Sequence, residues 1–310
     1  METTSVGRPT LAVVVPATDR PPTLERCVAA LESGERRPDE LKLQLEPAGA
    51  GPAAARNSAA GACEADVLVF VDSDVEVHPD ALVRIAEHFA ADSELTAAFG
   101  AYDDDPADRG LTSRYRNLLH HHVHAGAPGR AETFWAGLGA VRREAFEATG
   151  GFDADRFPRA SVEDIELGMR LRRSGAKVVL DPAIRGRHLK RWTPLSMIRT
   201  DFGRRGVPWM RLLLRERSHS TTLNLGWRQR ASAAASVALA AFVLTRRPRL
   251  AAAALLANLA LDRELYALLA GRGGPRLLLA GIGLHQLHQL AAAGSVPVAL
   301  ALRLLEERQR

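Results

Sequence analysis

Two acidic residues, Asp72 and Asp74, flank Ser73 directly after the apolar run VLVFV at residues 67–71. The run has the length and composition of a buried strand, and ligands bind outside the carboxyl ends of strands in a parallel sheet. Two carboxylates one residue apart can both reach a divalent cation, and hard oxygen ligands suit Mg²⁺ or Mn²⁺, which also bind diphosphates. The alternative is a polar turn that only ends the strand. The pattern therefore gives the hypothesis of a metal site at this turn.

A second acidic pair, Glu163 and Asp164, begins the segment VEDIELGMRLRRSG. Apolar residues at helical spacing and arginines toward its end predict a helix. Acidic residues at a helix start ordinarily interact favourably with the helix dipole. The functional interpretation makes one of the two carboxylates a general base that faces the metal site.

Two further segments contain residues suited to ligand binding. In FWAGLGAVRREAFEATGGFD (residues 134–153), Gly137 and Gly139 would let the backbone approach a ligand, and a helix follows them. In HLKRW (residues 188–192), His188 is a candidate third metal ligand or a donor to a diphosphate, although a single histidine is more often structural.

Alternating strands and helices must position these residues. Short β-rich runs predict strands at residues 11–16, 41–45, 67–71 and 97–102, and helical spacing predicts helices at residues 23–31, 53–62 and 79–89. Such alternation with buried apolar strands indicates an α/β sheet with helices on both faces.

Length and composition limit the class of protein. A chain of 310 residues suggests about two domains, and 46% hydrophobic with 25% charged residues excludes a wholly disordered chain. Two cysteines, Cys27 and Cys63, are too few for a disulfide scaffold and favour a reducing compartment. Residues 1–8 lack the pattern of a cleavable signal peptide.

The charge is unevenly distributed. The net charge is +5, but residues 225–310 contain eleven arginines and four acidic residues, a balance of +7, so the rest of the chain carries −2. This distribution argues against nucleic-acid binding by the rest of the chain. It indicates that residues 225–310, called the tail below, contact an anionic surface.

The C-terminal part changes character. Residues 193–229 mix arginines with aromatic and apolar residues, which is typical of a helix at a membrane interface or of a solvated helix. Residues 230–310 are rich in Ala and Leu, with uncharged stretches at 231–245, 250–261 and 277–302. Only the last is long enough to span a bilayer. We expect transmembrane helices here, and a soluble packed bundle is the alternative.

Taken together, five segments resemble the family 2 glycosyltransferases, which are inverting enzymes that use nucleotide sugars. They are VVVPATDR, ARN at Ala55–Asn57, ADVLVFVDSD, GLGAVRREAFEATGGFD and VEDIELGMRLRRSG, and the resemblance covers residues 11–192. It implies a Rossmann-like GT-A nucleotide-sugar-binding domain with a mostly parallel sheet at residues 1–192. An interfacial segment (193–229) and a hydrophobic helical region (230–310) would follow, as in membrane-associated members.

The resemblance also implies roles for individual residues. Asp164 would be the general base, with Glu163 beside it in the catalytic pair. Asp74 would be a ligand of Mg²⁺ or Mn²⁺, and the residue pattern described above adds Asp72 and His188 as candidate ligands. The residues that would bind the nucleotide sugar are Pro16, Thr18, Arg20, Glu46, Arg56, Asp72 and Ser73, and those that would bind the acceptor are Trp135, Gly137, Arg191 and Trp192.

Two positions depart from the family pattern. Glu46 is followed by Pro47-Ala48-Gly49 where the family usually has Asp-Gly-Ser, which leaves the identity of the nucleotide open. His188 stands where processive relatives have the Gln of a QxxRW motif, which leaves processivity open.

The expected function is inverting transfer of a sugar from a nucleotide-diphosphate donor to a lipid or glycan acceptor. The protein would lie at the cell membrane with its catalytic domain facing the cytoplasm, and nucleic acid is not an expected partner. One base suffices for a single in-line displacement, whereas glycoside hydrolysis needs two carboxylates. The alternatives are a nucleotidyltransferase on a similar sheet and a non-catalytic membrane protein that binds nucleotide sugars.

Overall fold

The computed structural model of the chain describes residues 8–216 and 226–308, which form two compact units. The first unit contains residues 8–107 and 124–190, and the second contains 108–123, 191–216 and 226–308. Residues 1–7, most of the N-terminal segment that lacks a signal-peptide pattern, and residues 217–225 of the predicted interfacial segment lie outside the described residues.

The first unit is built on one mixed sheet. Its strands are β1 (Leu11–Pro16), β2 (Glu40–Gln44), β3 (Val67–Val71), β4 (Val75–Val77), β5 (Leu95–Tyr102), β6 (Gly129–Arg130), β7 (Leu138–Arg142) and β8 (Lys177–His188). The strand order is β2-β1-β3-β7-β5-β8-β4, and β6 pairs with β8. Strands β1, β2, β3, β5 and β8 run in one direction, whereas β4, β6 and β7 run against it. The prediction of a mostly parallel sheet is thus confirmed.

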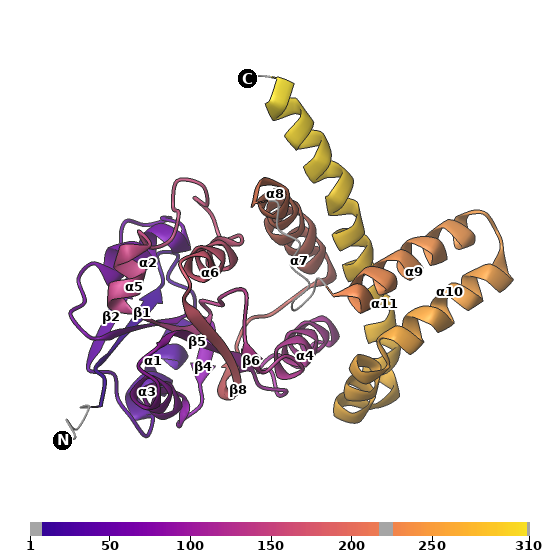
Figure 1. Ribbon diagram of the computed structural model, residues 1–310. Helices are drawn as coiled ribbons and strands as arrows, with labels where there is room; N and C mark the ends of the chain where they lie inside the picture. The colour runs from indigo at the N-terminus through magenta and orange to yellow at the C-terminus, as the bar shows by residue number, and fades with distance from the viewer. Residues whose placement is uncertain (1–7, 217–225, 309–310) are drawn as a thin grey trace. The chain divides into compact units, whose positions relative to one another are not determined.

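Helices cover both faces of this sheet. Figure 1 shows α1 and α3 on one face and α2, α5 and α6 on the other. Their bounds are α1 (Leu24–Ser33), α2 (Pro52–Ala60), α3 (Ala81–Ala91), α5 (Arg143–Ala148) and α6 (Glu163–Arg173).

Strands β1 and β3 form the core because each is apolar on both faces. All five residues of β3 are buried, as are five of the six residues of β1. Phe70 of β3 packs against Phe146 and Phe152 with ring centroids 5.3 and 5.1 Å apart. Burial of each such side chain stabilises the fold by about 1.5–3 kcal/mol. This core fixes the end of β3, where the acidic turn begins.

Four strands, β4, β6, β7 and β8, were not predicted from the sequence. We expected a glycine-containing loop around Gly139, but Gly139 lies in β7, antiparallel to Phe70 of β3. A Cβ at Gly139 would come within 2.3 Å of the Trp135 carbonyl oxygen, so glycine is needed because of a close approach of the backbone rather than a ligand.

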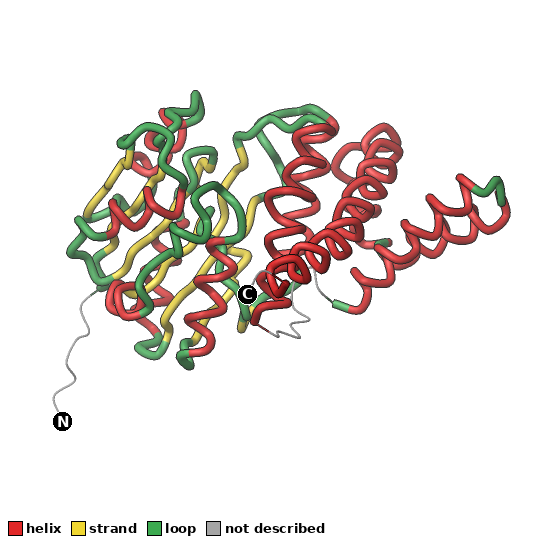
Figure 2. Tube along the Cα trace, turned by 90° about the horizontal axis from the view of Figure 1, so that it is seen from above, coloured by secondary structure: helices red, strands yellow, loops and turns green. Residues whose placement is uncertain are grey.

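The second unit is helical. Its elements are α4 (Leu111–Ala125, up to Val123 in this unit), α7 (Pro194–Arg199), the π-helical segment η1 (Thr200–Gly206), α8 (Val207–Glu216), α9 (Trp227–Leu244), α10 (Pro248–Leu261) and α11 (Arg263–Arg308). Gly274, with φ of 63°, divides α11 into two helices that run in different directions, as Figure 1 shows. Figure 2 shows α9 and α10 side by side as a hairpin.

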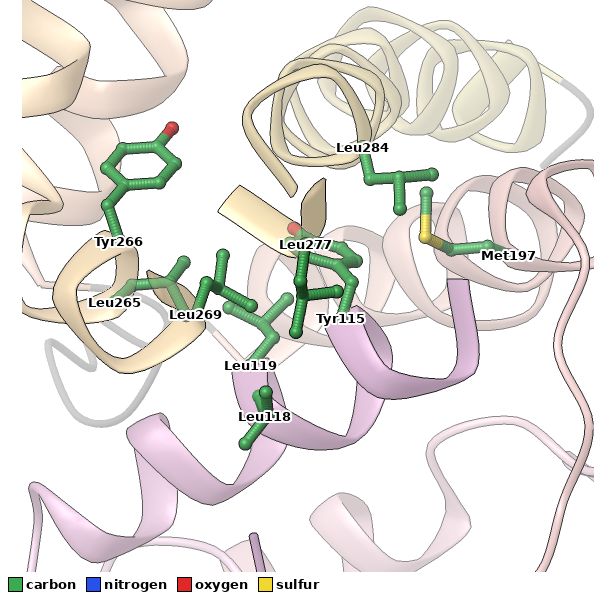
Figure 3. Close-up of a cluster of buried hydrophobic side chains, with 9 residues drawn as sticks. All are labelled: Tyr115, Leu118, Leu119, Met197, Leu265, Tyr266, Leu269, Leu277 and Leu284. Carbon is green, nitrogen blue, oxygen red and sulfur yellow. The ribbon is translucent and has the colours of Figure 1, made fainter. Parts of the chain in front are cut away.

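An apolar cluster joins α4 to α7 and α11 within the second unit (Figure 3). It contains Tyr115, Leu118, Leu119, Met197, Leu265, Tyr266, Leu269, Leu277 and Leu284. Helices α7 and α11 therefore cover one face of α4. This packing was not predicted from the sequence.

One helix among the described residues, α11, is long and apolar enough to cross a membrane by length and composition. Only 17% of its most apolar stretch is buried, so it differs from the core helix of a soluble protein.

Candidate functional site

The turn formed by Asp72, Ser73 and Asp74 is held by backbone hydrogen bonds from two neighbouring strands. The Asp72 amide donates to the Gly137 carbonyl oxygen at 3.0 Å, just before β7. The Leu189 amide, just after β8, donates to the Asp74 carbonyl oxygen at 2.8 Å. The acidic turn thus lies at the carboxyl end of β3, as predicted, and its backbone position does not depend on its side chains.

Arg56 of α2 connects the two acidic motifs. Its Nη2 donates to Asp72 Oδ1 at 2.6 Å, and its Nη1 donates to Glu163 Oε1 at 3.1 Å. The Arg56 side chain is 5% exposed, and its guanidinium also lies 5.3 Å from the centroid of the Phe152 ring. A single buried cation therefore binds together the turn after β3 and the start of α6.

The electrostatics explain why this arginine stays charged. Burial by itself would lower the pKa of Arg56, but the negative charges of Asp72, Glu163 and Asp164 raise it above its ordinary value. The bridge of Arg56 to Asp72 and Glu163 was not apparent in the sequence, where Arg56 was expected only to bind the nucleotide sugar.

We expect Arg56→Met to destabilise the first unit by about 3–5 kcal/mol, because it leaves the Glu163 carboxylate buried without its cation. Urea unfolding followed by fluorescence measures this change. The matched control is Arg84→Met, which breaks an ion pair with Asp80 on the surface of α3. Exposed pairs contribute at most about 1 kcal/mol, so an equal loss in the two variants would contradict a structural role for the bridge.

The two acids at the start of α6 have different surroundings. Glu163 is buried, and its second oxygen accepts a hydrogen bond from the Ser161 amide at 2.8 Å. Asp164 is partly exposed; its Oδ1 accepts from the Ile165 amide at 2.8 Å and its Oδ2 from the Ala136 amide at 3.3 Å. Both oxygens of Glu163 already accept hydrogen bonds, from Arg56 and from the Ser161 amide. Asp164 is therefore the better placed of the two acids to contact a substrate.

The Asp74 carboxylate lies beside two basic side chains. Its Oδ2 is 3.5 Å from Lys190 Nζ and 3.9 Å from His188 Nε2. The His188 ring is stacked on Tyr102, with centroids 4.2 Å apart and planes 15° from parallel. Lys190 and Tyr102 were not predicted as site residues, although Lys190 lies inside the HLKRW segment that contains His188.

We tested these residues as a site for a divalent cation. The described ranges 8–216 and 226–308 contain no preformed group of three or more His, Cys, Asp or Glu side chains around a metal position. Asp72 is hydrogen-bonded to Arg56, whereas Asp74 and His188 approach each other. The Asp74 carboxylate fits Mg²⁺ or Mn²⁺, which also take water and substrate phosphates as ligands, whereas the His188 imidazole suits Mn²⁺ better than Mg²⁺.

A second group of predicted residues lies at the ends of β1 and β2. The Thr18 hydroxyl donates to the Ala50 carbonyl oxygen at 2.6 Å, and Arg20 forms an exposed ion pair with Glu46 at 2.9 Å. Pro16 is the last residue of β1. These four predicted nucleotide-binding residues are therefore brought to one edge of the sheet.

The predicted acceptor residues fall in both units. Trp135 is buried in the first unit, and a Cβ on Gly137 would come within 2.4 Å of its indole ring. Trp135 also packs edge-on against Tyr102, with centroids 4.9 Å apart. Arg191 and Trp192 belong to the second unit, where the Trp192 amide donates to the Ser113 hydroxyl at 2.8 Å.

Cys27 lies beneath the acidic turn and is not a nucleophile. Its thiol donates to the Asp72 carbonyl oxygen with Sγ and O 3.6 Å apart. Burial, and then the charges of Asp72 and Asp74, raise the pKa of Cys27 to about 12, so the group is a neutral thiol at physiological pH.

The chain is similar to known glycosyltransferases in sequence and in fold. Residues 30–150 match the family model described as "Glycosyl transferase family 2". The "Pre-mycofactocin glycosyltransferase" of Mycobacterium tuberculosis, from strains CDC 1551 and H37Rv, is 27% identical over 155 residues. That match covers 46% of this chain and 31% of the relative, so it spans about a third of the length of the curated relatives.

Two solved structures are also similar. The mannosyltransferase PcManGT from Pyrobaculum calidifontis, solved with GDP-Man and Mn²⁺, superposes with a TM-score of 0.53 at 17% identity. The match covers 94% of this chain and 88% of that one. GalNAc-T7, solved with UDP, GalNAc and Mn²⁺, gives a TM-score of 0.45 at 15% identity and covers 67% of this chain and 48% of that one.

Proposed function

The chain belongs to glycosyltransferase family 2 and has a GT-A fold, and from this premise we propose that it transfers a sugar from a nucleoside-diphosphate donor to the hydroxyl of a membrane-held acceptor. The observation that carries the proposal is the bridge of Arg56 to Asp72 and Glu163. This bridge joins the acidic turn, which would hold the cation that binds the donor diphosphate, to the helix start that bears Asp164.

The donor would lie along the carboxyl ends of β1, β2 and β3. Thr18, Arg20 and Glu46, together with Pro16, would contact the nucleoside, and the polar edge that they form supports this role. Asp72 and Ser73 would contact the sugar and diphosphate, with Arg56 orienting Asp72 from beneath.

Asp164 would act as the base in a single displacement. The acceptor oxygen forms a bond to the anomeric carbon while the bond from that carbon to the diphosphate oxygen breaks. The acceptor proton passes to Asp164, and the nucleoside diphosphate leaves with the bonding electrons. Because the attack is opposite the leaving group, the anomeric configuration inverts.

Residues near Asp74 would stabilise the leaving group. Mg²⁺ or Mn²⁺ bound at Asp74 and His188 would offset the charge that develops on the diphosphate. Lys190, 3.5 Å from the Asp74 carboxylate, would add a positive charge at the same place. The Tyr102 ring holds the His188 imidazole in its orientation by stacking on it.

The acceptor would be a lipid or a glycan at the cytoplasmic face of the cell membrane, contacted by Trp135, Gly137, Arg191 and Trp192. The long apolar helix α11 supports association with a membrane, and the cytoplasmic side is part of the proposal.

A thermal-shift screen of nucleoside diphosphates and their sugars with Mn²⁺ tests donor binding. The ligand that binds the folded chain most tightly raises its melting temperature most, and this identifies the donor. A donor that binds but is never consumed, with any acceptor or with water, would favour the non-catalytic binding protein. Transfer of a nucleoside monophosphate from a nucleoside triphosphate to an acceptor, with release of pyrophosphate, would favour the nucleotidyltransferase.

We expect the full chain to stay in the membrane pellet after an alkaline carbonate wash, because α11 presents most of its apolar stretch on the surface. The full chain is required, since α4 packs against the tail through Tyr115 and Leu118. Release into the supernatant would contradict membrane integration and favour a soluble helical bundle.

A further inference from the structure

The hairpin of α9 and α10 buries polar side chains and exposes apolar ones. Ser232, Ser236 and Asn258 are at most 1% exposed, whereas Leu244 is 83% and Leu256 65% exposed. In water the opposite distribution is expected, and a large exposed apolar surface marks an interaction site.

Hydrogen bonds hold the inner side of the hairpin together. Asn258 Nδ2 donates to the hydroxyl oxygens of Ser232 at 2.8 Å and of Ser236 at 3.2 Å. The amide oxygen of Asn258 accepts from the Tyr266 hydroxyl at 2.7 Å and from Gln286 Nε2 at 2.8 Å. Small polar residues that join closely packed helices in this way are typical of helices surrounded by lipid.

The uncharged part of the hairpin has a length suited to a bilayer. The uncharged part of α9 is residues 231–244 and that of α10 is residues 250–261, so they are about 21 and 18 Å long at 1.5 Å per residue. Between Arg230 and Arg246 the chain has no charged residue, and neither does it between Arg249 and Asp262. The uncharged part of each helix therefore matches about two thirds of a hydrocarbon core that is about 30 Å thick.

The end of the hairpin is strongly basic. Arg246, Arg247 and Arg249 are exposed and lie at the connection between the two helices, which Figures 1 and 2 show as the free end of the hairpin. No acidic residue lies between Asp201 and Asp262 apart from Glu216, so the sequence of the hairpin offers these arginines no counter-charge. Their long side chains can extend to the phosphates of lipid headgroups.

We propose that the α9–α10 hairpin is a membrane-contacting element whose outer faces touch lipid acyl chains and whose three terminal arginines bind anionic lipid headgroups. The inference rests on the membrane association proposed above, to which it adds a second lipid-contacting surface besides α11. It does not depend on the chemistry of sugar transfer.

The contact with lipid is tested by placing a fluorophore on single cysteines in the full chain. Leu244→Cys and Leu256→Cys report the hairpin, Leu304→Cys reports α11, and Leu43→Cys is the control in the first unit, where Leu43 is 37% exposed. The native Cys27 and Cys63 are buried and are not expected to react. The chain is reconstituted in vesicles of phosphatidylcholine and phosphatidylserine, with and without nitroxide groups on the acyl chains.

We expect nitroxide lipid to quench the two hairpin labels and the α11 label by about twofold or more, and to leave the Leu43 label unchanged. Quenching at Leu304 without quenching at Leu244 and Leu256 would overturn the hairpin proposal and leave the membrane association intact. Quenching at none of the three would overturn both. If the hairpin labels emit as in an apolar environment but are not quenched by nitroxide lipid, protein rather than lipid covers the hairpin, for example a second copy of the chain. This result would also overturn the hairpin proposal.

The headgroup contact is tested by changing the three arginines to Gln. The variant should partition about 100-fold more weakly into vesicles with phosphatidylserine, since each arginine near an anionic surface contributes about tenfold or less. Partition into neutral phosphatidylcholine should change little. The control replaces Arg37, Arg173 and Arg185, exposed arginines of the first unit, by Gln. Equal weakening in the two triple variants would mean that only net charge matters and would overturn the headgroup assignment.

Discussion

Asp164→Asn should lower the turnover of sugar transfer by about 10² or more and leave donor affinity nearly unchanged, because the amide cannot accept the proton of the acceptor. The substitution keeps the shape of the side chain, and its remaining oxygen can still accept a hydrogen bond from the Ile165 or Ala136 amide. Steady-state turnover, together with donor titration by calorimetry, measures both quantities.

Glu163→Gln is the matched comparison, because it makes the same chemical change at the neighbouring residue. Glu163 is buried against Arg56, so its loss of charge should lower stability, by about 1–3 kcal/mol, more than it affects the chemical step. If Glu163→Gln stays stably folded and loses turnover while Asp164→Asn is mild, the roles of the two acids are reversed.

Asp74→Ala should abolish Mn²⁺-dependent nucleotide binding and transfer, and the fold should remain intact. The Asp74 carbonyl oxygen, which holds Leu189, is part of the backbone and survives the substitution. Its carboxylate is partly exposed and has basic neighbours rather than a place in the core. Nucleotide titration with Mn²⁺ and with a chelator, alongside a thermal melt, separates binding from folding.

The control for this variant is Asp92→Ala, which removes the same charge at the opposite end of the strands. Asp92 precedes β5 and forms an ion pair with Lys177 at 2.6 Å. Metal-dependent binding should be preserved in this control. Unchanged Mn²⁺-dependent binding in Asp74→Ala would remove Asp74 from the metal site.

The strands that were predicted well are those whose own residues determine their structure. β1 and β3 are continuous apolar runs rich in valine, and their observed bounds equal the predicted ones. Helices α1, α2 and α3 were predicted to within about two residues at each end, as is usual for sequence patterns. The local sequence was sufficient because strands that are buried on both faces are apolar throughout. No alternation of polar and apolar residues therefore has to be interpreted.

The strands that were missed depend on neighbours that are distant in sequence. β8 contains Pro182 and Gly186, which usually end a strand, and its pairing with β5 shifts register between Phe99 and Ala101. Gly100 lies at that shift, where a Cβ would come within 1.9 Å of the Ile184 carbonyl oxygen. A strand with such an irregularity is recognisable only when its partner is known.

The candidate site likewise contains features that the local sequence predicts and features that depend on residues distant in sequence. The positions of Asp72 and Asp74 after β3, and of Glu163 and Asp164 at the start of α6, followed from the local sequence. The bridge made by Arg56 did not, because 107 residues separate it from Glu163. Resemblance to the family pointed to Arg56, but only the fold gives it two carboxylate partners.

The most direct test of an inverting transferase uses water as the acceptor, so that no acceptor need be known. The purified full chain is incubated with the donor found by the thermal-shift screen and Mn²⁺, and proton NMR follows the anomer of the free sugar before it equilibrates. We predict that the first anomer released has the configuration opposite to that in the donor, and that Asp164→Asn slows its appearance. Release of the same configuration as in the donor, or release that is equally fast in Asp164→Asn, would contradict single displacement with Asp164 as the base.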